Sequence, residues 1–325
     1  MIRAHRSTTI GEVPIGPDHP RSTAPWATVA GLTVLTVLGL ALWLLVGSAR
    51  GPQPPFLGEA GVAPIRRPAR VDALVLAGSG SNLPVTRALT AAHAATGAAP
   101  PVVHASVGSG GGLRALIDGA VDIALVSRAL SPADRGAGMV AVPYARAPVM
   151  LAVHSSVPER DLDREGLLAI FDGRRTAWAD GTPIVVLQRE RGDSSHAAVA
   201  RVVAALADVD ETAYIARRWR VIYDDVGMQD AIASTEGSIG LLGSGSLPDD
   251  LPIRTLTFEG VAPTVAALTD GSYPLYKDLA FVTLGEPDAR ATELLRFVFS
   301  APGREIIEAH GCLPLGHRGA EAEDR

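Results

Sequence analysis

The chain has 325 residues, 47% of them hydrophobic and 20% charged, which is enough for one large or two medium domains with a real core. Its formal net charge of −6 is opposite to the basic excess of nucleic-acid-binding proteins, so no nucleic-acid partner is expected. The sequence holds 1 cysteine, Cys312, which excludes a disulfide framework and a cysteine zinc site and predicts a buried thiol. The only lysine, Lys277, lies outside any glycine-rich phosphate loop, which excludes an NTPase.

An apolar segment follows an N-terminal tail formed by residues 1–25. Residues 26–46 include no charged side chain, and about 20 helical residues at 1.5 Å each span a hydrocarbon core of roughly 30 Å. Tryptophans stand near both ends of the segment, as is usual at membrane interfaces. The sequence therefore predicts a single transmembrane anchor over 26–47. Cleavage after Ala49 stays open, because small residues precede that position.

The segment after the apolar run, residues 48–70, is rich in proline, glycine and arginine and shows no periodicity. This composition predicts an extended tether rather than a folded element. We expect the folded domain to begin near Val71. Residues 317–325 form a polar tail.

Three turns between a strand and a helix are rich in glycine and serine. They lie at 78–82, 108–112 and 192–195. Each helix start leaves backbone N–H groups without a partner, and the helix dipole adds about half a positive charge there. Three such starts that converge can bind a small oxyanion without a lysine, although each turn taken alone is also typical of ordinary helix capping.

The first two turns differ from the dinucleotide fingerprint G-x-G-x-x-G. Leu83 and Leu113 stand where the third glycine is required, so NAD binding is not expected. The residues suited to cap the first and third helices are Ser81, Asn82, Asp193 and Ser194.

Two charged residues add chemistry to these turns. Arg189 follows the third strand, where it can form a bidentate contact with an oxyanion or a surface ion pair with Glu190 or Asp193. Asp122 opens an apolar strand, either as a turn residue or as a group near the anion. A buried carboxylate tolerates an anion only when the anion carries a proton, as hydrogen phosphate does and sulfate does not.

Residues 71–315 resemble the phosphate-binding proteins of ABC importers, a family with the type II periplasmic binding fold. The motifs that carry the resemblance are GSGSNLP from Gly78, GSGGGLRALIDGAVDIALVSRALS from Gly108, LLAIFDGRRTAW from Leu167, RERGDSS from Arg189, EGSIGLL from Glu236, GVAPTVAALTDGSYPLYKDLAFVT from Gly260 and LLRFVFSAPGREIIEAHGCLPL ending at Leu315. The resemblance implies an α/β protein with a solute-binding domain of two lobes over 71–316. Lobe I would hold 71–150 and 239–316 and lobe II 151–238, with chain crossings near 149–153 and 237–242.

The resemblance also implies which groups face the ligand in the cleft between the lobes. These residues are Ser81, Asn82, Ser109, Gly110, Asp122, Arg189, Asp193, Ser194 and Ser195. Asn82 stands where the family usually has threonine or serine, which keeps a polar contact.

Asp193 departs from the family, which commonly reads glycine-serine-glycine-threonine at 192–195. Three accounts remain open. Asp193 turns away to cap its helix, or it accepts a second proton from dihydrogen phosphate, or the ligand is not phosphate.

The resemblance implies a membrane-tethered protein that captures inorganic phosphate or a similar tetrahedral oxyanion and delivers it to the membrane subunits of an ABC importer. On this basis residues 1–25 are expected on the cytoplasmic side of the membrane and residues 48–325 on its outer side. The alternative is an anchored anion sensor of the same fold, which an uncleaved span favours.

An enzyme is not expected. Ser195 and His196 superficially suggest a serine hydrolase, but adjacent residues of a helix point apart. The sequence has neither a G-x-S-x-G elbow nor an H-E-x-x-H pair. No catalytic residue, metal or cofactor is therefore assigned.

Overall fold

The structure is a computed structural model that describes residues 73–243, 247 and 250–316. These residues belong to one compact unit, Ala63–Arg325. The predicted tail at 1–25, the anchor at 26–47, the tether at 48–70 and the polar tail at 317–325 all lie outside the described residues. Within the described part of the chain, no helix is both long enough and apolar enough to cross a membrane.

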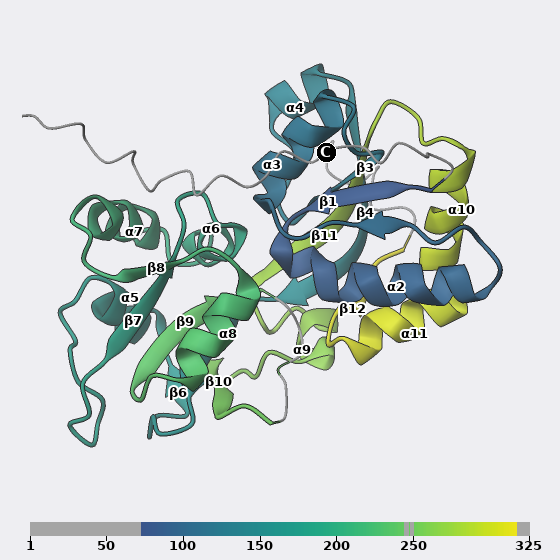
Figure 1. Ribbon diagram of the computed structural model, residues 1–325. Helices are drawn as coiled ribbons and strands as arrows, with labels where there is room; N and C mark the ends of the chain where they lie inside the picture. The colour runs from purple at the N-terminus through teal and green to yellow at the C-terminus, as the bar shows by residue number, and fades with distance from the viewer. Residues whose placement is uncertain (1–72, 244–246, 248–249, 317–325) are drawn as a thin grey trace, which may run out of the picture. The chain divides into compact units, whose positions relative to one another are not determined.

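Two mixed β-sheets organise the unit into two α/β lobes (Figure 1). The first sheet has the strand order β12-β4-β11-β3-β1-β2. Its strands are β1 (Val75–Gly78), β2 (Val102–Val103), β3 (Ile123–Val126), β4 (Met139–Pro148), β11 (Tyr276–Leu284) and β12 (Leu313–Pro314). The second sheet has the order β6-β10-β5-β9-β7-β8. Its strands are β5 (Met150–His154), β6 (Asp161–Leu162), β7 (Val185–Arg189), β8 (Arg220–Ile222), β9 (Ser238–Leu242) and β10 (Ile253–Phe258).

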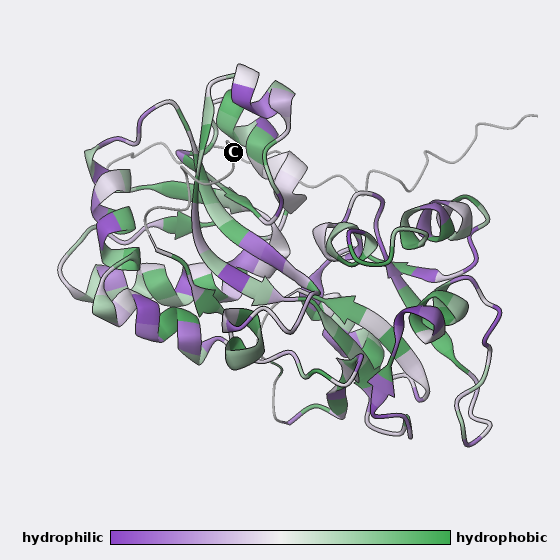
Figure 2. Ribbon diagram, turned by 180° about the vertical axis from the view of Figure 1, so that it is seen from behind, coloured by the Kyte–Doolittle hydropathy of each residue, from purple (hydrophilic) through white to green (hydrophobic). Residues whose placement is uncertain are grey.

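Helices cover both sheets. Those of the first lobe are the 3-10 turn η1 (Gly80–Asn82), α2 (Leu83–Ala95), α3 (Gly108–Ile117), α4 (Pro132–Gly136), α10 (Ala289–Val298) and α11 (Ala301–Ala309). Those packed on the second sheet are α5 (Arg164–Phe171), α6 (Ser194–Ala200), α7 (Leu206–Ile215), α8 (Asp225–Ala233) and α9 (Val265–Thr269). Figure 2 shows hydrophilic residues on the outer faces of these helices and hydrophobic residues along the strands.

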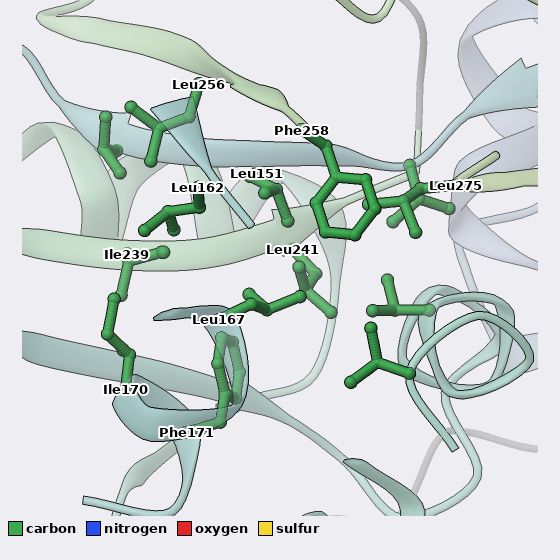
Figure 3. Packing of buried hydrophobic residues seen from close by; sticks show 14 of the residues in the cluster. Leu151, Leu162, Leu167, Ile170, Phe171, Ile239, Leu241, Leu256, Phe258 and Leu275 are labelled. Carbon is green, nitrogen blue, oxygen red and sulfur yellow. The ribbon is translucent and has the colours of Figure 1, made fainter. Parts of the chain in front are cut away.

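The central strands of each sheet are buried on both faces, which explains why β1, β3, β5 and β9 read as mostly apolar runs. In β1, Leu76 packs into a cluster with α2 and α10, whereas Val75 and Ala77 pack on the opposite face with α3. The second lobe has its main cluster between its sheet and α5, where Leu151, Leu162, Leu167, Ile170, Phe171, Ile239, Leu241, Leu256, Phe258 and Leu275 meet (Figure 3). Cys312 is fully buried in the first lobe, as predicted.

The lobe boundary differs from the expected one at the second crossing. The chain leaves the first sheet at Val149, between β4 and β5, close to the expected place. The segment 237–242 is not a crossing, because β9 lies inside the second sheet between β5 and β7 and is buried along its whole length. The strand β10 also joins the second sheet. The chain returns only before β11, where the carbonyl of Leu275 accepts a hydrogen bond from the N–H of Val149.

Candidate functional site

A cavity of about 300 Å³ lies where the two lobes meet. Its wall comes from 79–81, 106–110 and Arg128 of the first lobe and from 189–194 of the second. These segments follow the carboxyl ends of β1, β2, β3 and β7. In α/β sheets ligands bind outside the carboxyl ends of the strands, so this cavity is the candidate ligand site.

Six of the nine residues expected from the sequence line this cavity. They are Ser81, Ser109, Gly110, Arg189, Asp193 and Ser194. Ser195 is fully buried and does not line the wall, but its hydroxyl contacts the same lysine as Ser194. The structure does not bring Asn82 or Asp122 to the cavity wall.

Asn82 is buried beneath the site in a polar network. Its Nδ2 donates to the carbonyl of Val126 at 2.9 Å and to Ser127 Oγ at 3.1 Å. The hydroxyl of Tyr144 donates to Asn82 Oδ1 at 2.6 Å. Burial raises the pKa of Tyr144, which keeps this hydroxyl a donor. The amide therefore braces the first loop instead of facing the cavity.

Asp122 lies at the amino end of β3, whereas the cavity lies beyond the carboxyl end of that strand. Its Oδ2 accepts a hydrogen bond from the N–H of Val75 at 2.9 Å, and its Oδ1 is 3.5 Å from Arg290 Nη2. The expectation that Asp122 faces the anion disagrees with this position. A residue that precedes a parallel strand lies at the sheet edge opposite the ligand.

Asp193 is the N-cap of α6, as the first of the three accounts expected, but it does not turn away from the site, because it also lines the cavity wall. Its Oδ1 accepts the N–H groups of Ser195 at 2.8 Å and His196 at 3.2 Å. Its Oδ2 lies 3.4 Å from Arg189 Nη2. Burial acts to raise the pKa of Asp193, but the charges of Lys277 and Arg189 lower it more, so the pKa lies below its ordinary value and the carboxylate is ionised.

Arg189 forms a buried ion-pair network rather than a surface pair. Its Nη1 donates to Asp225 Oδ1, and its Nε donates to Glu190 Oε2 at 3.2 Å. Burial acts to lower the pKa of Arg189, but Asp193, Asp225 and Glu190 outweigh it and the pKa is raised. Three carboxylates thus neutralise the guanidinium, so a bidentate contact with a ligand requires at least one of them to give way.

Asp225 brings the second lobe against the first. It is the first residue of α8 and is 6% exposed, and no described residue donates to its Oδ2. A Cβ added to Gly80 would lie 3.9 Å from this oxygen, so the loop after β1 closes over it. Glu190 is less buried, and burial followed by the charge of Asp193 keeps its pKa raised although Arg189 acts to lower it.

Lys277 lies directly behind the cavity wall and is not among the site residues expected from the sequence. It lies on β11, is 1% exposed, and its Nζ donates to Ser81 Oγ at 2.7 Å, Ser195 Oγ at 2.8 Å and Ser194 Oγ at 3.0 Å. The sequence signal for this position is a single lysine inside the otherwise apolar strand 276–284. In the described part of the chain, no group of three or more His, Cys, Asp and Glu side chains could hold a metal ion.

Comparison with curated proteins identifies relatives by sequence. Phosphate-binding protein PstS of Bacillus subtilis is 27% identical over 214 residues, which are 64% of this chain and 69% of the relative. Phosphate-binding protein PstS 2 of Streptococcus agalactiae is 30% identical over 107 residues, which are 33% of this chain and 36% of that relative.

Solved structures agree with the fold. A putative phosphate ABC transporter substrate-binding protein with bound phosphate, from Clostridium perfringens, superimposes with a TM-score of 0.66 at 21% identity, covering 75% of this chain and 100% of that one. An ABC-type phosphate transport receptor from Vibrio cholerae gives 0.56 at 21% identity, covering 74% and 99%. The fold is therefore the two-lobed type II periplasmic-binding-protein fold.

The family itself follows from a match that covers most of the chain. Residues 63–302 match the family model PBP_like_2, described as a PBP superfamily domain. The curated relatives are binding proteins, and this protein is not an enzyme, as the sequence predicted. Because the match spans well over half of its residues, the chain belongs to the PBP superfamily domain family.

Proposed function

We propose that the protein is a solute-binding protein that captures inorganic phosphate, or a similar tetrahedral oxyanion, in the cavity between its lobes. The observation that carries this proposal is the wall of the cavity, which combines the hydroxyls of Ser81, Ser109 and Ser194 with the glycine-rich start of α3. Hydroxyls and free backbone N–H groups suit an anion of small radius. The names of the curated relatives support phosphate as the ligand.

The ligand set that we propose is revised by the geometry. Ser81, Ser109, Gly110 and Ser194 stay as direct contacts, and Arg189 and Asp193 stay in the wall as a charged pair. Ser195 acts behind the wall. Asn82 and Asp122 are removed from the set, because both are engaged elsewhere.

Calorimetry of the full chain in detergent against phosphate, arsenate, sulfate and molybdate tests the ligand. We expect phosphate and arsenate to bind at one site per chain. Ser109→Ala should weaken phosphate binding about fivefold or more, because a hydroxyl contact with a charged group is lost. Absence of binding by all four anions would refute the proposal.

Delivery to an ABC importer on the outer side of the cytoplasmic membrane is part of the same proposal. The predicted anchor at 26–47 would tether the domain there, with 1–25 inside. A protease that reaches a C-terminal tag in spheroplasts supports this placement, and a protected tag contradicts it. Copurification with a membrane sensor in place of transporter subunits would favour the second candidate, an anchored anion receptor, which the long apolar span of the sequence also suits.

A further inference from the structure

The ammonium of Lys277, the single lysine of the chain, uses all three of its N–H donors in hydrogen bonds to serines. A lysine ammonium has three N–H donors and no acceptor. Lys277 places these donors on three serine oxygens at 2.7, 2.8 and 3.0 Å, so each hydrogen has one partner. The side chain is 1% exposed, which puts the charge behind the cavity wall and not inside it.

The direction of these hydrogen bonds fixes the direction of the hydroxyls. Because the ammonium only donates, each serine oxygen accepts, and the hydroxyl hydrogen must point away from Lys277. Among the described residues, the hydroxyl oxygens of Ser81 and Ser194 have no hydrogen-bond partner other than Lys277. Both serines line the cavity. Their hydrogens are thus free to point into it.

The two serines come from different lobes. Ser81 belongs to η1 of the first lobe and Ser194 begins α6 of the second, while Lys277 lies on β11 of the first sheet. Burial lowers the pKa of Lys277 below its ordinary value, while the carboxylates of Asp193 and Asp225, both in the second lobe, act to raise it and so favour the ammonium form. The ammonium therefore connects the two lobes through the same two hydrogen bonds that orient the hydroxyls of Ser81 and Ser194.

Gly243 shows that the backbone leaves room for this ammonium. A Cβ at position 243 would lie 2.1 Å from Lys277 Nζ and 2.8 Å from Ser195 Oγ. Gly243 directly follows β9, so the end of that strand forms one wall of the ammonium pocket. Any larger residue would displace the lysine without changing its charge.

We propose that Lys277 is a positioning residue of the anion site, whose ammonium holds the hydroxyls of Ser81 and Ser194 as hydrogen-bond donors towards the ligand. It does not touch the ligand. This inference rests on the proposed function and deepens it, because the cavity then prefers a ligand that presents hydrogen-bond acceptors to both serines. A ligand that presents N–H or ammonium groups at that position leaves the hydroxyl hydrogens of both serines without an acceptor.

The test measures phosphate affinity of the full chain by calorimetry in a double-mutant cycle. Lys277→Met should weaken phosphate binding by at least about tenfold. In the Ser81→Ala/Ser194→Ala background the same change should cost less than about threefold, because no hydroxyl remains to be oriented. An equal loss in both backgrounds would mean that Lys277 acts only as a distant charge and would overturn the proposal.

Gly243→Ala separates position from charge, since it keeps the lysine and moves its ammonium. We expect it to weaken phosphate binding severalfold, and an unchanged affinity contradicts the proposal. The matched control is Arg146→Met, which removes a positive charge from β4, the strand paired with β11. Arg146 pairs with Asp278 and does not line the cavity, so its loss should leave the affinity unchanged.

Spectroscopy gives a second readout that needs no change at Lys277. Because the chain has one lysine, labelling with ¹³Cε-lysine yields one side-chain signal. Phosphate should shift this signal with the same saturation as the calorimetric titration, and the shift should shrink in Ser81→Ala/Ser194→Ala. A signal that stays in place while phosphate binds refutes the proposal. If the wild-type chain binds no phosphate at all, the proposed function itself fails.

Discussion

At the scale of single residues, the charge balance around Arg189 decides how the site is built. Two cations, Arg189 and Lys277, are buried against the carboxylates of Asp193, Asp225 and Glu190. A buried charge destabilises the fold unless it is paired. Removal of one member of this network therefore leaves its partners as uncompensated buried charges. Asp193 has two structural roles, because it pairs with Arg189 and also caps α6.

Asp193→Asn tests this balance because it keeps an oxygen for the cap but removes the charge. We expect a loss of about 1 to 3 kcal/mol in the free energy of unfolding at pH 7. The pKa of Asp193 is lowered in the fold, so its stabilisation is complete above the unfolded pKa and disappears as the pH falls through the folded value. Urea denaturation should therefore show a constant difference from wild type above about pH 5 that shrinks in stronger acid. A difference that grows in acid would contradict the assignment.

Asp122 offers a contrasting prediction. Its carboxylate accepts the N–H of Val75 at the sheet edge away from the cavity. Asp122→Ala leaves that N–H unpaired and should cost about 1 to 3 kcal/mol of stability. Phosphate affinity should stay within about twofold of wild type, because sites without shared partners act independently. A loss of affinity much larger than this, with the fold intact, would return Asp122 to the ligand set.

At the scale of elements, the sequence predicted those strands and helix starts that depend on local residue patterns. The apolar runs became strands, and the glycine-serine turns at 78–82, 108–112 and 192–195 became the starts of helices beside the cavity. The membership of β9 and β10 in the second sheet was not predictable from their own residues, because a buried strand reads the same in either sheet. The place of Lys277 was missed for a similar reason. Its partners lie 83 and 196 residues away, at Ser194 and Ser81.

Gly112 shows how closely one element can approach another. A Cβ at this position would lie 2.7 Å from Gly78 Cα and 2.8 Å from the carbonyl oxygen of Ala77. Gly112→Ala should therefore push α3 away from β1 and cost about 1 to 3 kcal/mol, as overpacking does. A Cβ at Gly110, in the same helix, would meet no atom within 4 Å outside that helix's own backbone, so Gly110→Ala should not destabilise the fold. Thermal unfolding of the two variants compares them, and equal melting temperatures would refute the packing argument.

At the scale of the whole molecule, the ligand enters a site whose most buried cations already face carboxylates, while Arg128 and Arg191 also line the wall. Arg189 and Lys277 face three carboxylates. An incoming oxyanion adds further negative charge to a partly desolvated cavity, and like charges in such a place repel strongly unless a proton lies between them. The protein as a whole is also acidic, with a net charge of −6, so selectivity has to come from hydrogen bonds.

The final prediction concerns this selectivity. Asp193 is committed to two N–H groups and Arg189, which leaves Glu190 as the carboxylate of the cavity wall best placed to accept a proton from the ligand. Hydrogen phosphate can donate that proton and sulfate cannot, so at pH 7.5 phosphate should bind at least about 100-fold more tightly than sulfate. Glu190→Gln removes the repulsion between this carboxylate and sulfate. It should reduce the ratio of phosphate affinity to sulfate affinity about tenfold or more.

The ratio of phosphate affinity to sulfate affinity should depend on pH, because the pKa of Glu190 is raised. Burial and the charge of Asp193 raise it. As the pH falls through that pKa, Glu190 becomes neutral and its repulsion of sulfate disappears. Sulfate affinity of the wild type should therefore rise between pH 7.5 and 5, whereas in Glu190→Gln it should stay flat, because no carboxyl at position 190 titrates. Competitive calorimetry with both anions at several pH values measures this difference. Equal binding of phosphate and sulfate by the wild type at pH 7.5 would show that the carboxylates of the wall do not govern the choice of ligand.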